Sequence, residues 1–476
     1  MKYIKHLTLL TFIALMVSCS DSDKENEIFE NKPILPRKEL RGVWITTAWG
    51  IDWPMSDYNS ASQKQKYINY LDLFVKSNIN AIFFQIRGMA DAFYDSPYES
   101  WSKYITGTAG MKPDYDVLKF LIEEAHKRNI QFHAWLNPYR ISTRANNTIP
   151  FPQLDIKIPA KLTKDYEKIR IYNPALPEVQ TRLTEIIKDV ITKYDVDGIH
   201  LDDYFYPSLE ASEKMNDDVE YETYGKDKFS NISDFRRNNV NVVVKNIQKT
   251  IIETRPDVIF SISPAANNDN NYNVLFADVT KWSQEGWVDV IIPQLYFATG
   301  TSESSFNQRL NWWSQFTYNS HLLTGYGIYK FGDPTAGEKF QTIEELKNQF
   351  EFAGTKEKVK GSVLYSAKYL VENKIEIMSA LKEIYRTPVL PPYLGRSAAT
   401  IPASPANIRI NGTNLSWEEV KDTYYAVYKH NGNNQVASLV GTTKERTFKL
   451  TEKGTYFVTA VNKNNAESEE SSSISY

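Results

Sequence analysis

The sequence contains one cysteine among 476 residues and no apolar run long enough to span a membrane. A single cysteine cannot form an intramolecular disulfide, so the fold must depend on a packed core. The longest apolar run, from about Leu7 to Val17, is half the ~20 residues of a spanning helix, which excludes a polytopic membrane protein. An excess of one charge is also lacking, because 55 Lys and Arg stand against 58 Asp and Glu. Without a basic excess, the sequence predicts no nucleic-acid partner.

What is present is typical of a globular protein. Hydrophobic residues make up 42% and charged residues 24% of the chain, which excludes wholesale disorder. The length is sufficient for two or three domains. Aromatic residues reach 13%, with 30 Tyr and 10 Trp. Such rings suit core packing and also stacking against the faces of sugars.

The amino-terminal residues predict export. Residues 1–18 contain Lys2 and Lys5 before the apolar run and read as a secretory signal peptide. The run Leu15–Cys19 resembles a bacterial lipobox, in which the cysteine is acylated and becomes the mature amino terminus. The alternative is an ordinary signal peptide that happens to contain a cysteine. With lipidation at Cys19, the anchor is the only expected contact with a membrane.

Residues 19–36 are polar and acidic near their start and predict a solvated tether. The stretch SDSDKENE also resembles the acidic signal that sends some Gram-negative lipoproteins to the cell surface. The expected location is therefore the outer membrane or cell surface of a Gram-negative bacterium.

The carboxyl-terminal part predicts a second, smaller domain. Residues 388–403 form a Pro-rich linker without helical periodicity. Residues 404–476 alternate apolar and polar side chains in short runs, which is typical of an all-β immunoglobulin-like sandwich. The spacing of Trp417, Tyr428 and Tyr456 resembles a fibronectin type III domain. This part carries no convergent acids, so we expect a spacer or docking module.

Between these ends, residues 37–387 alternate apolar runs of strand length with amphipathic stretches of helix length. Strands that are apolar on both faces and alternate with helices indicate a parallel sheet. Eight such units predict a (β/α)₈ TIM barrel, with a doubly wound open sheet as the alternative. The predicted strands are Arg41–Thr47, Asn80–Arg87, Gln131–Tyr139, Asp197–Tyr204, Val258–Pro264, Asp289–Phe297, His321–Ile328 and Lys360–Ser366.

The active site of such a barrel lies at the carboxyl ends of its strands. Polar, aromatic and cationic residues gather at these ends, as a carbohydrate site requires. The residues predicted to bind substrate are Trp44, Gln85, Arg87, His133, Asn137, Tyr139, Arg140, His200, Tyr204, Gln294 and Tyr296.

The fourth predicted strand ends in two adjacent acids, Asp202 and Asp203. Strand alternation directs Asp202 into the barrel mouth, and Asp203 lies where the strand becomes a loop. Glycoside hydrolysis needs an anionic carboxylate and a second group that donates a proton. We expect Asp202 in the anionic role and Asp203 as its partner. The alternative is that either acid pairs with Arg87 or Arg140 and only braces the rim.

Several long motifs resemble the bacterial glycosyl-hydrolase-like family ten over roughly residues 37–385. They are RGVWITTAWGIDWP (41–54), FFQIRGMADAFYDSPYESWSKYITGTAG (83–110), EEAHKRNIQFHAWLNPYR (123–140), DGIHLDDYFYP (197–207), DFRRNNVN (234–241), SISPAANN (261–268) and IIPQLYF (291–297). The resemblance implies a barrel glycosidase, with some members acting on peptidoglycan strands that lack stem peptides. It places the rim positions on Arg87, Asp91, Asn137, Tyr139, Arg140, Asp202, Asp203, Gln294 and Tyr296.

The sequence leaves the catalytic acid and the nucleophile open. The run around Asp202 also resembles the fourth-strand motif of chitinase-type enzymes, but their acidic residue is replaced by Tyr204. Asp91 is the candidate general acid, with a loop cap as its alternative role. Glu220 and Glu222 are weaker candidates. A substrate acetamido group, polarised by Asp202, is a further alternative to a protein nucleophile.

Aromatic and cationic residues suggest how a glycan binds. The proposed sugar platforms are Trp44, Trp49, Trp101, Tyr139 and Tyr296. Arg87 and Arg140 could bind a sugar carboxylate, such as the lactyl group of muramic acid, because a guanidinium matches a carboxylate in shape.

Two other classes of function remain as alternatives. A metal hydrolase could use His133, His200 and Asp202, but the first strand lacks the paired histidines on which amidohydrolase barrels build a metal site. The second alternative is a surface lipoprotein that binds glycans but has no catalytic activity. We expect a monomer that needs no cofactor or metal.

Overall fold

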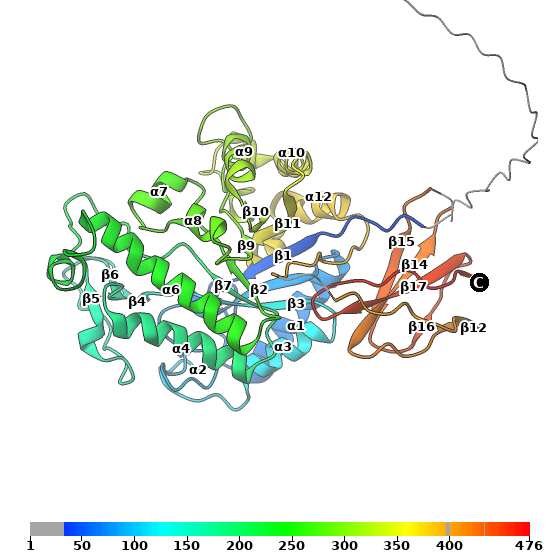
Figure 1. Cartoon of the computed structure of the whole chain (residues 1–476), viewed down its shortest axis with the longest axis horizontal. Coiled ribbons are helices and arrows are strands. Elements are labelled where there is room, and N and C mark those ends of the chain that lie inside the picture. Colours follow the sequence, from blue (N-terminus) through cyan, green and yellow to red (C-terminus); the bar gives the residue numbers. More distant parts are fainter. Residues whose placement is uncertain (1–32, 397–399, 433) are drawn as a thin grey trace, which may run out of the picture.

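The structure is a computed structural model that describes residues 33–396, 400–432 and 434–476. The predicted signal peptide, Cys19 and the tether up to residue 32 lie outside the described residues. Two parts are visible in Figure 1, a barrel of strands and helices and a smaller β domain, drawn in orange and red, at one end of it.

The larger part is a closed parallel barrel with the strand order β1-β11-β10-β9-β8-β7-β3-β2. The prediction of a (β/α)₈ barrel is confirmed, and the open doubly wound sheet is wrong. All eight predicted strands are present, although most are shorter than predicted. Their bounds are β1 Leu40–Ile45, β2 Ala81–Arg87, β3 Gln131–Leu136, β7 Gly198–Leu201, β8 Ile259–Ile262, β9 Val290–Ile291, β10 His321–Gly327 and β11 Val359–Tyr365.

Alternate residues of the strands fill two separate cores. Val43, Ile45 and similar residues pack outward against the helices in the larger core. A smaller core fills the barrel interior, since successive side chains of a strand point to opposite faces. Its buried members are Leu40, Trp44, Ala81, Phe83, Trp135, Ile259, Val290, Ile292, Leu323, Val363 and Leu394.

Helices surround the barrel because each presents one apolar stripe to the strands. In α4 the buried residues include Val179, Leu183, Ile186 and Val190, spaced by three or four residues, and Pro177 begins the helix. The helices are α1 Ser60–Lys76, α2 Lys103–Thr106, α3 Val117–His126, α4 Pro177–Lys193, α5 Asp218–Glu220, α6 Ile232–Thr254, α7 Asn268–Asn273, α8 Val279–Gln284, α9 Phe306–Phe316, α10 Ile343–Gly354, α11 Ala367–Glu372 and α12 Ile377–Ile384.

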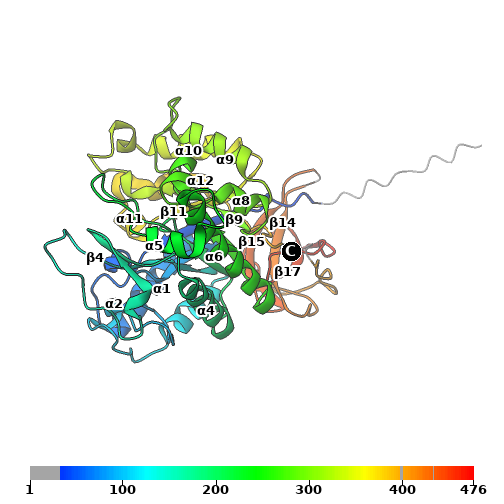
Figure 2. The same cartoon turned by 60° about the vertical axis from the view of Figure 1, so that its left-hand side comes forward.

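A small antiparallel sheet extends the barrel after β3. Its strands are β4 Arg140–Thr143, β5 Thr163–Asp165 and β6 Ile169–Tyr172, in the order β4-β6-β5. The sheet lies at the end of the barrel away from the β domain (Figure 1). Turning the molecule brings this extension and α2 forward, with α6 running along the side of the barrel (Figure 2). This sheet was not predicted from the sequence.

The carboxyl-terminal part folds as two antiparallel sheets around its own core, with Leu415, Trp417, Val427 and Val458 buried. Their orders are β12-β13-β16 and β15-β14-β17-β18. The prediction of a small all-β domain is confirmed, and its assignment as fibronectin type III stays a prediction. The strands are β12 Arg409–Asn411, β13 Asn414–Ser416, β14 Thr423–His430, β15 Ser438–Thr443, β16 Thr447–Lys449, β17 Thr455–Asn462 and β18 Ile474–Ser475.

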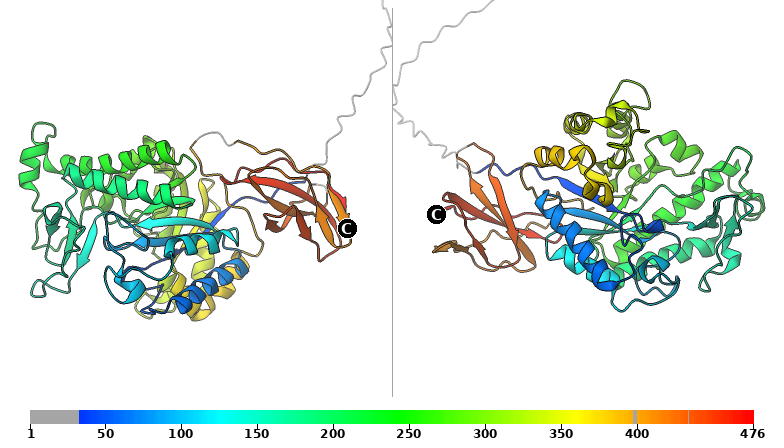
Figure 3. Two further views of the ribbon diagram at one scale, coloured as in Figure 1. Left: turned by 90° about the horizontal axis from the view of Figure 1, so that it is seen from below. Right: turned by 180° about the vertical axis from the view of Figure 1, so that it is seen from behind.

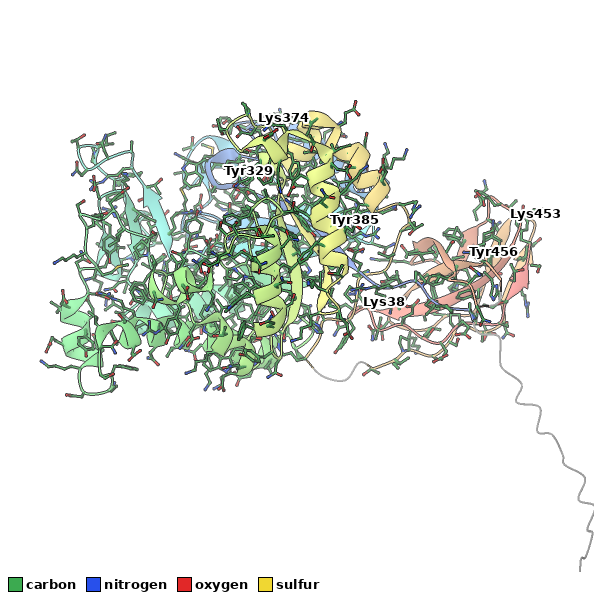
Figure 4. The ribbon with its side chains drawn as sticks, turned by 90° about the horizontal axis from the view of Figure 1, so that it is seen from above. Lys38, Tyr329, Lys374, Tyr385, Lys453 and Tyr456 are labelled. Atoms are coloured by element: carbon green, nitrogen blue, oxygen red, sulfur yellow. The ribbon has the colours of Figure 1, made fainter. Side chains whose placement is uncertain are left out.

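The β domain packs against the end of the barrel where the parallel strands begin (Figure 3). Lys463 bridges Asp195 at 2.7 Å and Asp257 at 2.9 Å, both in loops that precede barrel strands. Lys38 lies between the two parts (Figure 4), where its ammonium is 2.8 Å from Glu467. In the described ranges, no helix is both long and apolar enough to cross a membrane.

Candidate active site at the carboxyl ends of the barrel strands

Asp202 follows the last residue of β7 and lies on the floor of the barrel mouth. Its side chain is almost fully buried, and both carboxylate oxygens accept hydrogen bonds. The Trp135 indole donates at 3.0 Å and the Asn137 amide at 3.1 Å. Burial raises the pKa of Asp202, while the Arg140 charge and these donors oppose the rise. The carboxylate is therefore held in a fixed position as a hydrogen-bond acceptor.

Asp203, the next residue, has different surroundings. It is half-buried, and burial together with the neighbouring Asp202 charge raises its pKa to about 7. A hydrogen bond from Gln294 opposes this rise only in part. Two adjacent carboxyl groups with unequal surroundings can hold different protonation states near neutral pH, as acid and anion roles require.

Arg140 joins these acids to two exposed aromatic rings. Its guanidinium carbon lies 5.0 Å from the Trp49 ring centre and 4.6 Å from that of Tyr204. Nε donates to the Gly88 carbonyl at 3.1 Å, which fixes the side chain. Trp49 is 49% and Tyr204 48% exposed, although large rings are normally buried. The two exposed rings form an aromatic surface beside Asp202, and the Arg140 guanidinium, 4% exposed, packs against both of them.

Three tyrosines form a second aromatic surface. The rings of Tyr296 and Tyr365 are stacked at 5.9 Å, and Tyr329 meets Tyr296 edge-on at 5.8 Å. Tyr329 lies on the barrel, well away from the β domain (Figure 4). The Asp203 charge contributes to raising the pKa of Tyr296, after burial and the other two tyrosines. These tyrosines therefore extend the site from Asp203 across the ends of β10 and β11.

Arg87 does not face the open mouth, which corrects its prediction as a substrate ligand. It is 1% exposed, and its guanidinium binds the Glu99 carboxylate through two nitrogens, at 2.7 and 2.6 Å. It also donates to the Asn137 carbonyl, and the Tyr172 hydroxyl donates to Glu99 at 3.1 Å. Because its donors are used inside the protein, Arg87 braces the loops that carry Asn137.

Gln85 and Asn137 also act on the protein rather than on open space. The Gln85 side-chain oxygen accepts from the backbone N–H groups of Thr47 and Ala48, at 3.1 and 2.8 Å. It thereby fixes the turn that carries Trp49. Asn137 donates to Asp202 and accepts from the Arg140 N–H at 2.8 Å. Both predicted substrate ligands are buried positioning residues.

Trp44, His133 and His200 lie inside the barrel, below the mouth. This corrects the prediction that they bind substrate. The Trp44 indole donates to His200 Nε2 at 3.1 Å, a bond across the barrel interior between β1 and β7, which are three strands apart in the barrel order. His200 Nδ1 bonds the Ser261 hydroxyl at 2.8 Å, and His133 stacks on Phe83 at 4.5 Å. Among the described residues, no group of three or more His, Cys, Asp and Glu side chains could hold a metal ion.

Other predicted residues have structural contacts of their own. Tyr139 is fully buried and Trp101 is nearly so. The prediction that their rings stack on sugars is therefore wrong. The Asp91 carboxylate accepts from the Met89 N–H at 3.0 Å, as a loop cap does. Glu220 pairs with Lys164 at 2.8 Å, and Glu222 pairs with Lys226. None of these acids has a contact with Asp202 or Asp203 in the described part of the chain.

Three residues of the site were missed by sequence reasoning. Tyr365 ends β11, and the strand-end argument that selected Tyr296 could have found it. Glu99 lies in a loop without periodicity, so nothing in the sequence marked it as the partner of Arg87. Asp52 is also buried in a loop, where it accepts from the Thr46 N–H at 2.6 Å and the Ser366 hydroxyl at 2.7 Å. It ties the end of β1 to the end of β11.

This geometry agrees with a comparison of the sequence with known families. The family described as Glycosyl hydrolase-like 10 matches residues 39–342. The chain belongs to this family. The prediction of a glycoside hydrolase is confirmed at the level of enzyme class.

Similar proteins include glycosyl hydrolase YngK of Bacillus subtilis, 38% identical over 91% of this chain and 92% of its own length. Glycosyl hydrolase DigH of Escherichia coli K12 is 30% identical over 79% of this chain and 95% of its own length. Among solved structures, the catalytic domain of β-amylase from Paenibacillus polymyxa aligns with 74% of this chain and 98% of its own, at 12% identity and a TM-score of 0.46.

Proposed function

We propose that this protein is a cell-envelope lipoprotein that hydrolyses O-glycosidic bonds in peptidoglycan glycan strands. The observation that carries the proposal is the unequal pair of carboxyl groups at the end of β7. Asp203 has a pKa of about 7, whereas Asp202 is held by two N–H donors beside Arg140. Such a difference in surroundings assigns the proton donor and the anion of a glycosidase.

In this proposal, Asp203 transfers its proton to the glycosidic oxygen, and the bond from that oxygen to the anomeric carbon breaks. The carbon carries positive charge as the bond breaks, and the Asp202 anion stabilises that charge. A water molecule then adds its oxygen to the carbon and returns a proton to Asp203. Asp202 is 2% exposed and both of its oxygens accept hydrogen bonds. These contacts favour a stabilising anion over a direct nucleophile.

The aromatic surfaces support a glycan as substrate. Trp49 and Tyr204 on one side, and Tyr296, Tyr329 and Tyr365 on the other, offer rings against which sugar faces can stack. Arg140 would bind an acidic group on the sugar, such as the lactyl carboxylate of muramic acid. Replacement of Arg140 by Ala should therefore weaken binding of acidic ligands more than that of neutral ones. Equal losses would contradict this role.

The proposed location rests on the sequence before residue 33. Residues 1–19 contain basic residues, then an apolar run and then a cysteine, and this order supports lipidation at Cys19. The acidic stretch that follows supports display at the surface of a Gram-negative cell. Radiolabelled palmitate should enter the wild-type protein and should not enter a Cys19→Ala variant. Labelling of the variant would overturn the proposed anchor.

The decisive experiment is digestion of purified glycans. A protein of residues 31–476 is incubated with peptidoglycan strands lacking stem peptides and with other bacterial and plant glycans, and the products are identified by mass spectrometry. We expect cleavage by the wild type and by the control Asp227→Asn, which changes an exposed acid in the turn before α6. We expect none by an Asp202→Asn, Asp203→Asn double variant. Binding without cleavage of any glycan by the wild type would indicate a capture protein instead.

A further inference from the structure

A polar cavity lies at the opposite end of the barrel from Asp202. It has a volume of about 470 Å³ and separates the start of β3 and β7 from the β domain. Ligand sites for small molecules usually measure roughly 300–1,000 Å³, so this cavity is large enough to hold one. None of its lining residues belongs to the barrel mouth.

The inner walls of the cavity are fixed by contacts between the two parts. On the barrel side, His126 Nε2 lies 2.8 Å from the Asp197 carboxylate. On the β-domain side, the Tyr424 hydroxyl donates to Asn465 at 3.3 Å. Asn129 donates across the gap to Thr442 at 2.8 Å. A cavity with walls held in this way needs little ordering when a ligand binds.

Other polar groups that line the cavity have no side-chain partner in the described part of the chain. The Gln131 amide, the Glu419 carboxylate and the Arg446 guanidinium form no side-chain hydrogen bond or ion pair within the described residues. Together they present donors and acceptors toward the same space as the Tyr424 ring. Hydroxyl groups both donate and accept, so they can satisfy such a mixed set.

The charges around the cavity argue against a strongly charged ligand. Five carboxylates line it, against three Lys and Arg side chains, so a polyanion would be repelled. For a cation, Asp195 is already paired with Lys463 at 2.7 Å and Asp197 with His126. The other three carboxylates, Glu419, Asp422 and Glu445, are exposed to solvent, where salt screens their attraction. A neutral molecule rich in hydroxyl groups meets neither obstacle.

We propose that this cavity is a second binding site, which holds one or two units of a neutral saccharide. It would keep the protein on a glycan while the barrel mouth cuts elsewhere. The inference rests on the proposed function in one respect only, which is that the protein encounters glycans. The cavity and the acids lie at opposite ends of the barrel strands, so the two sites can be tested separately.

The test uses calorimetric titration with cellobiose, maltose and N,N′-diacetylchitobiose, in the Asp202→Asn, Asp203→Asn background to prevent hydrolysis. A Gln131→Ala, Arg446→Ala pair should weaken binding of at least one disaccharide about tenfold or more. The control Arg409→Ala removes an exposed arginine of the same domain that does not line the cavity, and it should leave binding unchanged. Unfolding midpoints of both variants verify that the fold is retained.

Measurement of the cleavage rate tests the proposed function separately from this second binding site. With the two acids intact, the Gln131→Ala, Arg446→Ala pair should cleave short glycans at the wild-type rate. Equal disaccharide binding by the pair and the parent, or no binding by either, would overturn the second site whatever the turnover result. Preferential binding of a Glu-Lys dipeptide at the same residues would also overturn it, in favour of a peptide.

Discussion

Asp203 should set the pH dependence of the enzyme. Its pKa of about 7 means that the proposed proton donor is lost as the pH rises through neutrality. We expect kcat/KM to fall about tenfold per pH unit above this value. The measurement is release of reducing ends across the pH range. The Asp227→Asn control should keep the decline at the same pH, and a rate that stays constant up to about pH 9 would contradict the role of Asp203.

The same residue should lower stability in alkaline solution. The pKa of Asp203 is higher in the folded protein, about 7, than its ordinary value of 3.8. Its contribution to stability is therefore complete below about pH 4 and is lost as the pH rises through 7. Asp203→Asn should gain stability over the wild type, by about 2 kcal/mol more at pH 8 than at pH 5. Urea unfolding at both pH values measures the difference, and a pH-independent gain would contradict it.

The buried pair of Arg87 and Glu99 should be sensitive to loss of one partner. Both side chains are 1% exposed or less, so Glu99→Gln leaves an uncompensated charge in the interior. The expected cost is about 3–5 kcal/mol in the free energy of unfolding. The exposed pair of Glu222 and Lys226 offers a matched control, since Glu222→Gln should cost less than about 1 kcal/mol. Similar costs at both positions would show that Arg87 is solvated or re-paired.

The residues whose position follows from strand ends were predictable from the sequence, and those set by loops were not. Asp202, Asp203 and Arg140 lie together at the barrel mouth because parallel strands end on one side. Arg87 was misplaced because the sequence does not show that the Glu99 loop folds over it. Strand alternation likewise cannot tell how deep in a barrel His200 lies.

At the scale of elements, the parallel strands were predictable because both of their faces are buried. The pattern is long and apolar in β2 and β10, where all or nearly all residues are buried. In β9 only Val290–Ile291 pair as a strand, although the apolar run continues further. The sheet of β4, β5 and β6 escaped prediction because its strands have three or four residues with mixed polarity.

The turn after β1 offers a test that separates stability from binding. Trp49 has a φ of 54°, a left-handed conformation that is unfavourable for a large side chain. Trp49→Gly should keep or raise the free energy of unfolding, by up to about 1 kcal/mol, because glycine adopts this conformation freely. It should still lower kcat/KM for polymeric glycan about tenfold through loss of the ring.

Trp49→Ala serves as the control for the backbone, since it also removes the ring but keeps the unfavourable φ. We expect it to match the glycine variant in activity and to be less stable. Wild-type activity of both variants would remove Trp49 from the binding surface.

At the scale of the whole molecule, the segment after α12 closes the barrel and does not merely connect two domains. Leu390 and Leu394 are buried, and Leu394 belongs to the core inside the barrel. Arg396 pairs with Asp289 in the loop before β9. The Pro-rich composition predicted a boundary but could not show that Leu394 packs inside the barrel and Leu390 in the core of the β domain.

Two truncations test this closing segment. A chain that ends at residue 387 should be less stable than one that ends at residue 396, by about 2–5 kcal/mol, because it loses a buried leucine in the interior. Thermal and urea unfolding of both chains measure the difference. Equal stability would mean that the segment contributes no packing.

The chain enters its folded part beside the β domain, where Ile34 pairs with Val436 and its carbonyl accepts from the Ala437 N–H at 2.8 Å. Any surface that holds the amino terminus therefore holds the molecule by its β-domain end. The barrel mouth lies at the other end of the barrel, so the β domain separates it from the point of attachment. A longer or shorter β domain would change the distance between that point and the polymer that the enzyme meets, without altering any residue of the mouth.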